Sequence, residues 1–147
     1  MDNFTKAERI EAQLINKLFK QVGVTNYTIT PEKSYSQHDG TYVRSNGDNV
    51  IYEVKVRYVG INQYPTTVIE QAKYDYMIKT AKETNSTPYL LAFYPKENKV
   101  LYIDLTENLD FTTTTQYAPK TTCGDNQMVQ KSFVNIPIRK NQILDLC

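Results

Sequence analysis

The pattern of apolar and polar positions divides the chain into helical and extended segments. Residues 5–22 carry apolar side chains three to four positions apart, which predicts an amphipathic helix. Thr5 and Glu8 fit a capping box at its start, and Gly23 suits its end. A second helix is predicted over 67–84, and its expected buried side chains are those of Ile69, Ala72, Tyr76 and Ile78.

Strands are predicted between and after these helices, over residues 24–30, 40–44, 50–58, 89–94 and 100–105. An Asn46-Gly47 turn joins the second and third strands as a hairpin, because both residues tolerate a positive φ. The pattern weakens after residue 106 into Thr-rich loops, with one or two short strands near 131–138. The resulting order, α-β-β-β-α-β-β, predicts an α/β (α+β) fold with a mixed central sheet flanked by helices.

Length and composition limit the class of protein. The 147 residues suit one domain, 1–147, and no apolar run approaches the ~20 residues that span a bilayer. The charged N-terminal segment has no apolar h-region, and two cysteines make no disulfide framework, so we expect a cytoplasmic protein without membrane contact. The net charge of +1 neither indicates nor excludes a nucleic-acid partner.

Candidate chemistry lies on the predicted hairpin. One His and two distant Cys cannot build the usual nitrogen–sulfur zinc site, so metal chemistry would rest on carboxylates. Glu53 and Lys55 share one face of a strand, with Cα atoms about 6.5–7 Å apart, and Asp39 precedes the neighbouring strand. The ordinary alternative is a solvated cross-strand charge pattern worth tenths of a kcal/mol.

This arrangement resembles a known family. His38-Asp39-Gly40, followed after a gap by Glu53-Val54-Lys55-Val56, looks like the signature of PD-(D/E)XK nucleases. The resemblance covers about residues 5–105 and is nearest to archaeal-type Holliday junction resolvases. It implies a restriction-endonuclease-like αβββαβ core. Residue 38 is His where the signature has Pro, and residues 106–147 form a β-leaning extension that matches no motif.

The resemblance implies an endonuclease that hydrolyses DNA with Mg²⁺ or Mn²⁺ and no organic cofactor, and relatives of this kind are commonly homodimers. Asp39, Glu53 and the Val54 carbonyl would hold the metal, and Lys55 would orient the attacking water. Glu8 and Gln71 would play supporting roles, although Glu8 fits a helix cap equally well. The alternative is a catalytically inactive nucleic-acid- or protein-binding module on the same fold.

Contacts to nucleic acid are expected around this site. The candidates are Ser36, His38, Arg44, Arg57 and Lys73. Tyr35, Tyr58 and Tyr64 fall in or beside loops near the motif, where they can stack on bases. The simpler interpretation assigns the lysines to a mixed-charge helix face and most of the 12 tyrosines to strands and core.

Overall fold

The computed structural model describes residues 6–30, 38–107, 111–119 and 128–147. Its larger sheet has six strands in the order β1-β2-β3-β5-β6-β9, and β3 and β5 are its parallel pair. These strands are β1 Tyr27–Ile29, β2 Gly40–Val43, β3 Asn49–Val56, β5 Ser86–Tyr94, β6 Lys99–Asp104 and β9 Ile143–Asp145. The predicted mixed sheet is therefore confirmed.

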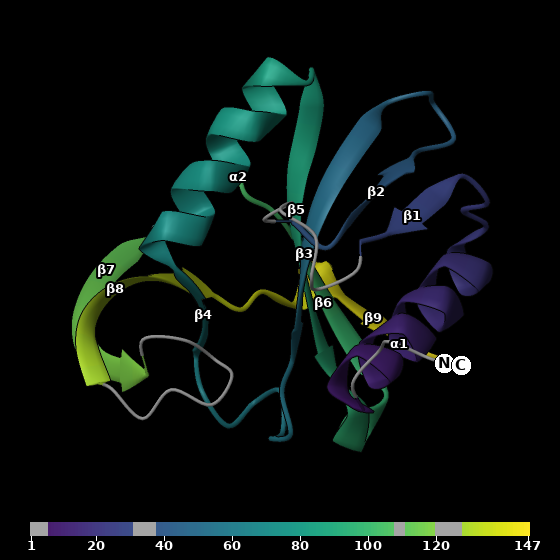
Figure 1. Ribbon diagram of the computed structural model, residues 1–147. Coiled ribbons are helices and arrows are strands. Elements are labelled where there is room, and N and C mark those ends of the chain that lie inside the picture. Colours follow the sequence, from purple (N-terminus) through teal and green to yellow (C-terminus); the bar gives the residue numbers. More distant parts are fainter. Residues whose placement is uncertain (1–5, 31–37, 108–110, 120–127) are drawn as a thin grey trace.

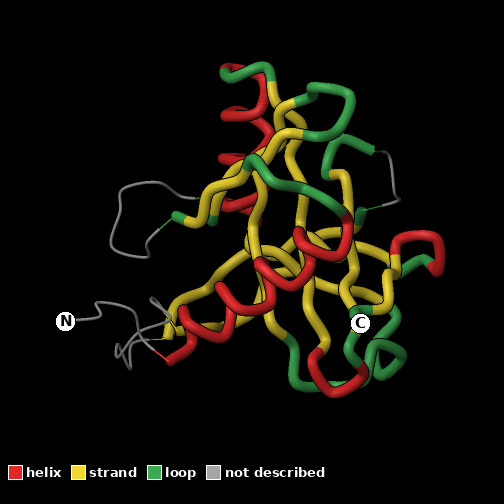
Figure 2. Tube along the Cα trace, turned by 90° about the vertical axis from the view of Figure 1, so that its right-hand side faces the viewer, coloured by secondary structure: helices red, strands yellow, loops and turns green. Residues whose placement is uncertain are grey.

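The two helices cover opposite faces of this sheet (Figures 1 and 2). Helix α1, Lys6–Val22, packs its Ile15, Leu18 and Phe19 on one face. Helix α2, Gln71–Glu83, packs Met77 and Ala81 on the other. The side chains of β3 alternate between these two layers, because successive residues of a strand point to opposite faces.

A second, three-stranded sheet has the order β4-β8-β7. It comprises β4 Thr66–Glu70, β7 Thr112–Pro119 and β8 Met128–Pro137, and it curves away beside the start of α2 (Figure 1). Short 3-10 helices at Pro95–Glu97 and Lys140–Gln142 complete the described elements. The C-terminal segment was expected to hold only one or two short strands, and its long β7–β8 pairing corrects that expectation.

The predicted start of the second helix is wrong. Residues 66–69 are all β-branched, which favours a strand, and they form β4 paired with β8. The helix begins directly afterwards at Gln71, so its buried face differs from the predicted one. Ile69 is buried on β4, Tyr76 and Ile78 are half-buried, and Ala72 is exposed.

Other elements follow the sequence closely, with shifted ends. The first strand is shorter than expected, whereas β5 begins at Ser86 rather than at residue 89. In the hairpin turn Gly47 has a φ of 91°, but Asn46 does not have a positive φ. Its side chain instead accepts a hydrogen bond from the Asp48 amide at 2.9 Å. Within the described residues, no helix is long and apolar enough to cross a membrane.

Candidate active site on the α2 side of β3

Asp39 is fixed at the end of the β2–β3 ladder. The last ladder pair is Gly40 with Tyr52, so Asp39 stands opposite Glu53. The Asp39 amide donates to the Tyr52 carbonyl at 2.9 Å, and its carboxylate Oδ2 accepts from the Val54 amide at 2.7 Å. A side-chain oxygen thus replaces the backbone acceptor at this point, which holds the carboxylate beside β3.

Gly40 makes this placement possible. The Tyr52 hydroxyl donates a 2.6 Å hydrogen bond to the Thr28 carbonyl and passes against Gly40 on the way. A Cβ at position 40 would lie 2.2 Å from the Thr28 oxygen and 2.3 Å from the Tyr52 hydroxyl. Glycine is therefore required here by lack of space. The backbone next to Asp39 is closely confined as a result.

Glu53 is a buried carboxylate on the α2 face, only 5% exposed. Its Oε2 lies 3.3 Å from the Lys73 Nζ of α2, but it accepts no hydrogen bond within the described part of the chain. The pKa of Glu53 is raised to about 8, mainly by burial and then by the charge of Asp39 and a hydrogen bond with it, against the lowering effects of Lys73 and Lys55. Two facing carboxylates, of which Glu53 is buried and Asp39 half-buried, favour a proton or a cation between them.

Lys55 follows Glu53 on the same face of β3 and is half-buried. Unlike Lys73, it makes no hydrogen bond or ion pair within the ranges that the structure describes. Its ammonium group therefore remains available for a phosphate oxygen or a water molecule. Lys73 thus compensates the charge of Glu53, whereas Lys55 can contact a substrate.

His38, the residue before Asp39, contacts Tyr76 of helix α2. Its Nδ1 lies 3.1 Å from the Tyr76 hydroxyl, and the two rings stack with centroids 6.0 Å apart. Burial lowers the pKa of His38 below 6.5, and Lys73 lowers it further, against the raising effect of Asp39. The imidazole is therefore neutral at physiological pH and ties the Asp39 loop to α2. Tyr76 has no signal in the sequence that would have assigned it this role.

Two predicted supporting residues are not joined to this site by any contact described. Glu8 lies in the first turn of α1, the helix that packs on the opposite face of the sheet. Gln71 donates instead to the Asp75 carboxylate at 2.9 Å on its own helix. Among the described residues, no three His, Cys, Asp or Glu side chains gather closely enough to hold a metal. Thr5, the expected capping partner of Glu8, falls outside them.

The expected nucleic-acid contacts are dispersed. Arg44 lies 4.8 Å above the Tyr89 ring, which packs with the α1 layer, so it is on the wrong side of the sheet to join Glu53. Arg57 is on the same face as Glu53 and donates to the Val68 carbonyl at 3.2 Å. Lys73 is brought to the site by its ion pair with Glu53. Ser36 and Tyr35 lie outside the described residues.

Comparisons with known proteins support the fold alone. No protein-family model matches the chain, and no curated protein sequence matches it. The solved structure of Hjc, a Holliday junction resolvase from the archaeal hyperthermophile Archaeoglobus fulgidus, is similar with a TM-score of 0.54 at 12% sequence identity. The match covers 87% of this chain and 83% of that one. The α/β architecture around β3 is thus the same fold as that resolvase structure has.

Proposed function

We propose that the chain is a metal-dependent endonuclease that hydrolyses phosphodiester bonds of DNA. One observation carries the proposal: the buried Glu53 carboxylate faces Asp39 with an oxygen that accepts no hydrogen bond from the described residues. Two neighbouring carboxylates repel each other, and the Val54 amide and the Lys73 ammonium compensate them only in part, so a divalent cation between them would lower the cost of ionising both. The shared fold with an archaeal resolvase supports the same function.

The residues present fit a hard divalent cation. Asp39 and Glu53 supply carboxylate oxygens, the Val54 carbonyl is a third candidate, and oxygen ligands are those that Mg²⁺ and Mn²⁺ prefer. A cation bound there supplies Lewis-acid polarisation of a phosphoryl oxygen and a bound water of lowered pKa. Glu8 remains a supporting candidate without a described contact to this pair.

The side chains of this site have separate tasks. Lys55 holds the attacking water or a phosphate oxygen, because its positive charge acts on Glu53 and its ammonium group has no other described partner. Lys73 neutralises Glu53 at 3.3 Å in the absence of a cation. The imidazole of His38 steadies the Asp39 loop against Tyr76. Gln71 can support the site only after its side chain releases the Asp75 carboxylate.

A catalytically inactive binding module on this fold is the second candidate. The net charge of +1 and the ion pair between Lys73 and Glu53 favour it, because the pair already compensates one carboxylate. The two candidates differ in metal affinity. In a binding module, Glu53 would only pair with Lys73 and Asp39 would only accept the Val54 amide, so we expect no affinity for a divalent cation.

Cleavage of a panel of branched, duplex and single-stranded DNA tests the proposal. We expect cutting with Mg²⁺ or Mn²⁺, none with a chelator, and a loss of at least a hundredfold in Lys55→Ala. Lys79→Ala is the matched control, because Lys79 is an exposed lysine of α2. Calorimetric titration with Mn²⁺ supplies a second readout.

Two results would contradict the nuclease. One is the absence of cutting and of Mn²⁺ binding, which leaves the binding module. The other is cutting that survives in Lys55→Ala. The homodimer expected from the resemblance stays a prediction, which sedimentation of the full chain tests.

A further inference from the structure

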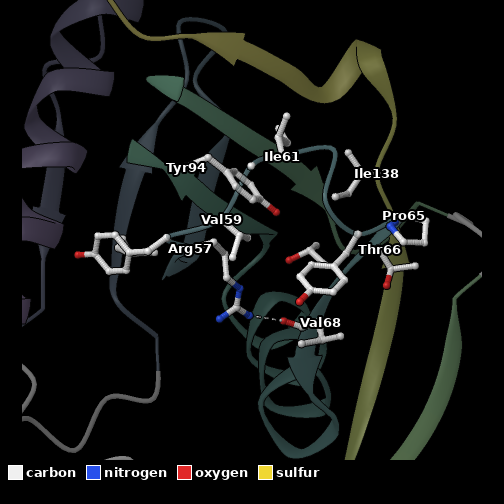
Figure 3. A pocket seen from close by; sticks show the side chains of 13 residues that line it. Arg57, Val59, Ile61, Pro65, Thr66, Val68, Tyr94 and Ile138 are labelled. Carbon is white, nitrogen blue, oxygen red and sulfur yellow. Dashed lines mark hydrogen bonds between the residues drawn. The ribbon is translucent and has the colours of Figure 1, made fainter. Parts of the chain in front are cut away.

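A pocket of about 500 Å³ opens where β3 leaves the central sheet (Figure 3). Its walls come from the segment after β3, the start of β4, the end of β5 and Ile138 beyond β8. The volume lies within the range of roughly 300–1,000 Å³ that ligand pockets have. The lining is largely apolar, with Val59, Ile61 and Tyr94 among its residues.

A few polar groups interrupt this apolar lining. Thr67 is 4% exposed, and its hydroxyl lies near the Tyr94 phenol without a hydrogen bond of good geometry within the described residues. The neighbouring Tyr94 is also buried, which raises the pKa of its phenol and keeps it protonated as a donor. The Arg57 guanidinium bonds to the Val68 carbonyl and brings a positive charge (Figure 3). Hydroxyls that are buried in a pocket and only weakly bonded to each other favour a ligand with hydrogen-bonding atoms.

Two exposed aromatic rings belong to the same pocket. Tyr58 is 57% exposed and Tyr64 is 56% exposed, although large aromatic side chains are normally mostly buried. Rings left open in this way provide stacking platforms for nucleobases, whose flat faces are apolar and whose edges carry hydrogen-bonding atoms. The pocket thus combines stacking surfaces, a polar interior group and a cation.

The pocket adjoins the candidate active site along one strand. Glu53 and Lys55 point to the same side of β3, and Arg57, the first residue after the strand, continues the alternation at steps of about 6.5–7 Å, because its amide still bonds to the Phe93 carbonyl of β5. Arg57 is the residue at which the site ends and the pocket begins. A DNA strand held by Lys55 therefore has its neighbouring nucleotide within reach of the pocket.

We propose that this pocket receives an unpaired base of the DNA strand that lies in the Asp39–Glu53–Lys55 site. The inference rests on the proposed function, because it takes DNA as the ligand. A base can enter only after leaving its stack, which costs least where it is already unpaired. The protein therefore prefers DNA with unpaired nucleotides, such as bulges and single-stranded flaps, to regular duplex.

The test uses binding without cleavage. A duplex with one bulged 2-aminopurine and a fully paired duplex of the same flanking sequence are titrated with the full-length chain in a chelator. We expect the bulged duplex to bind at least tenfold more tightly, and the 2-aminopurine fluorescence to change when the base stacks on tyrosine. Tyr64→Ala and Thr67→Val should each reduce the affinity ratio severalfold and weaken the fluorescence change.

Tyr117→Ala is the matched control. Tyr117 is 69% exposed on β7 and pairs with Gln130, toward the end of β8 that is remote from the pocket. This variant should leave the ratio unchanged. Equal binding of the two duplexes, no binding of either, or a ratio that Tyr64→Ala leaves intact would overturn the proposal.

The same experiment separates this inference from the nuclease. Because no cation is present, a protein that fails to cut can still show the bulge preference and its loss in Tyr64→Ala, which supports the pocket alone. Cutting of paired and bulged DNA at equal rates, together with equal binding, would reject the pocket and retain the nuclease.

Discussion

The two faces of strand β3 are almost equally buried but differ in chemistry. Toward α1, Tyr52 and Val54 are 0% and 3% exposed and lie in an apolar layer. Toward α2, Glu53 is 5% exposed and faces Asp39 and Lys73. One strand thus supplies packing on one side and a charged site on the other. Burial alone does not distinguish a structural position from a functional one, and the chemistry of the neighbours does.

The energetic consequences of the two faces are opposite. Each side chain in the α1 layer stabilises the fold by roughly 1.5–3 kcal/mol through burial of apolar surface. A buried Glu without hydrogen-bond donors lowers stability whenever it is ionised. Mutations on the α1 face should therefore affect folding, and mutations on the α2 face should mainly affect activity.

The largest expected effect is the loss of cleavage rate in the Asp39→Asn variant. This change removes one charge of the proposed metal site but keeps an oxygen that can accept the Val54 amide hydrogen bond. Loss of a carboxylate ligand should lower the cleavage rate about a thousandfold, or roughly 4 kcal/mol of transition-state stabilisation. Stability should change by less than about 1 kcal/mol. Single-turnover cleavage and urea unfolding measure the two effects.

The matched variant on the opposite face is Val54→Ala. It should lower the free energy of unfolding by about 2 kcal/mol and leave the cleavage rate of the folded fraction near that of the wild type. The proposed difference between the two faces would be contradicted if Asp39→Asn lost activity because it unfolds. Full activity in that variant would contradict it as well.

Gly40→Ala should have the next largest effect, because it disturbs both faces. The new Cβ would overlap the Thr28 carbonyl and the Tyr52 hydroxyl, at 2.2 and 2.3 Å, and relief requires movement of β1 or of the Tyr52 ring. We expect a loss of about 3 kcal/mol in the free energy of unfolding. Thermal and urea unfolding check this value.

Gly47→Ala provides the comparison for that variant. No atom lies within 4 Å of a Cβ at Gly47, so its cost comes only from the φ of 91° and should be about 1 kcal/mol. An equal loss in the two variants would mean that the confined backbone next to Asp39 is not the cause.

Local pattern was sufficient to predict one half of the site. The alternation along β3 places Glu53 and Lys55 on one face, and the hairpin register sets Asp39 opposite Glu53. Both depend on residues close in sequence. The role of Gly40 was not predicted, because it arises from the path of the Tyr52 ring over the strand.

The second sheet and the pocket could not be predicted, because they depend on contacts distant in sequence. Strand β4 is stabilised by β8, and the ion pair between Glu70 and Lys131 joins positions 61 apart. Without that partner, residues 67–70 are compatible with the start of a helix. The pocket likewise depends on Ile138 meeting the segment after β3. The β-branched residues 66–69 are a local signal for an extended segment, but nothing local identifies either long-range partner.

The third effect is the pH dependence of the free energy of unfolding that Glu53 causes. The folded protein, without a metal, binds this proton more tightly than the unfolded chain, with a pKa of about 8 against 4.5. Its contribution is therefore fully present below pH 4.5 and is lost as the pH rises toward 8. In Glu53→Gln this loss should disappear, so the variant should be clearly more stable than the wild type at pH 8, by an amount that is much smaller at pH 5.

Urea unfolding in a chelator at pH 5 and pH 8 measures that difference. Glu83→Gln is the control, because Glu83 is exposed at the end of α2 and should leave the pH dependence unchanged. A wild-type protein whose stability does not fall between these pH values would show that Glu53 is not a destabilised buried carboxylate.

The smallest effect is expected on the α1 side, in Tyr52→Phe. The ring stays in the apolar layer and only the 2.6 Å hydrogen bond to the Thr28 carbonyl is lost, which should cost about 1 kcal/mol of unfolding free energy. Burial raises the pKa of the Tyr52 phenol, so the bond persists throughout the neutral range and this cost should not vary between pH 5 and pH 8. Cleavage should remain within about threefold, because Asp39 keeps its backbone bond to the Tyr52 carbonyl. A pH-dependent cost, or a large loss of cleavage, would mean that the two faces of β3 are coupled through Tyr52 rather than separate.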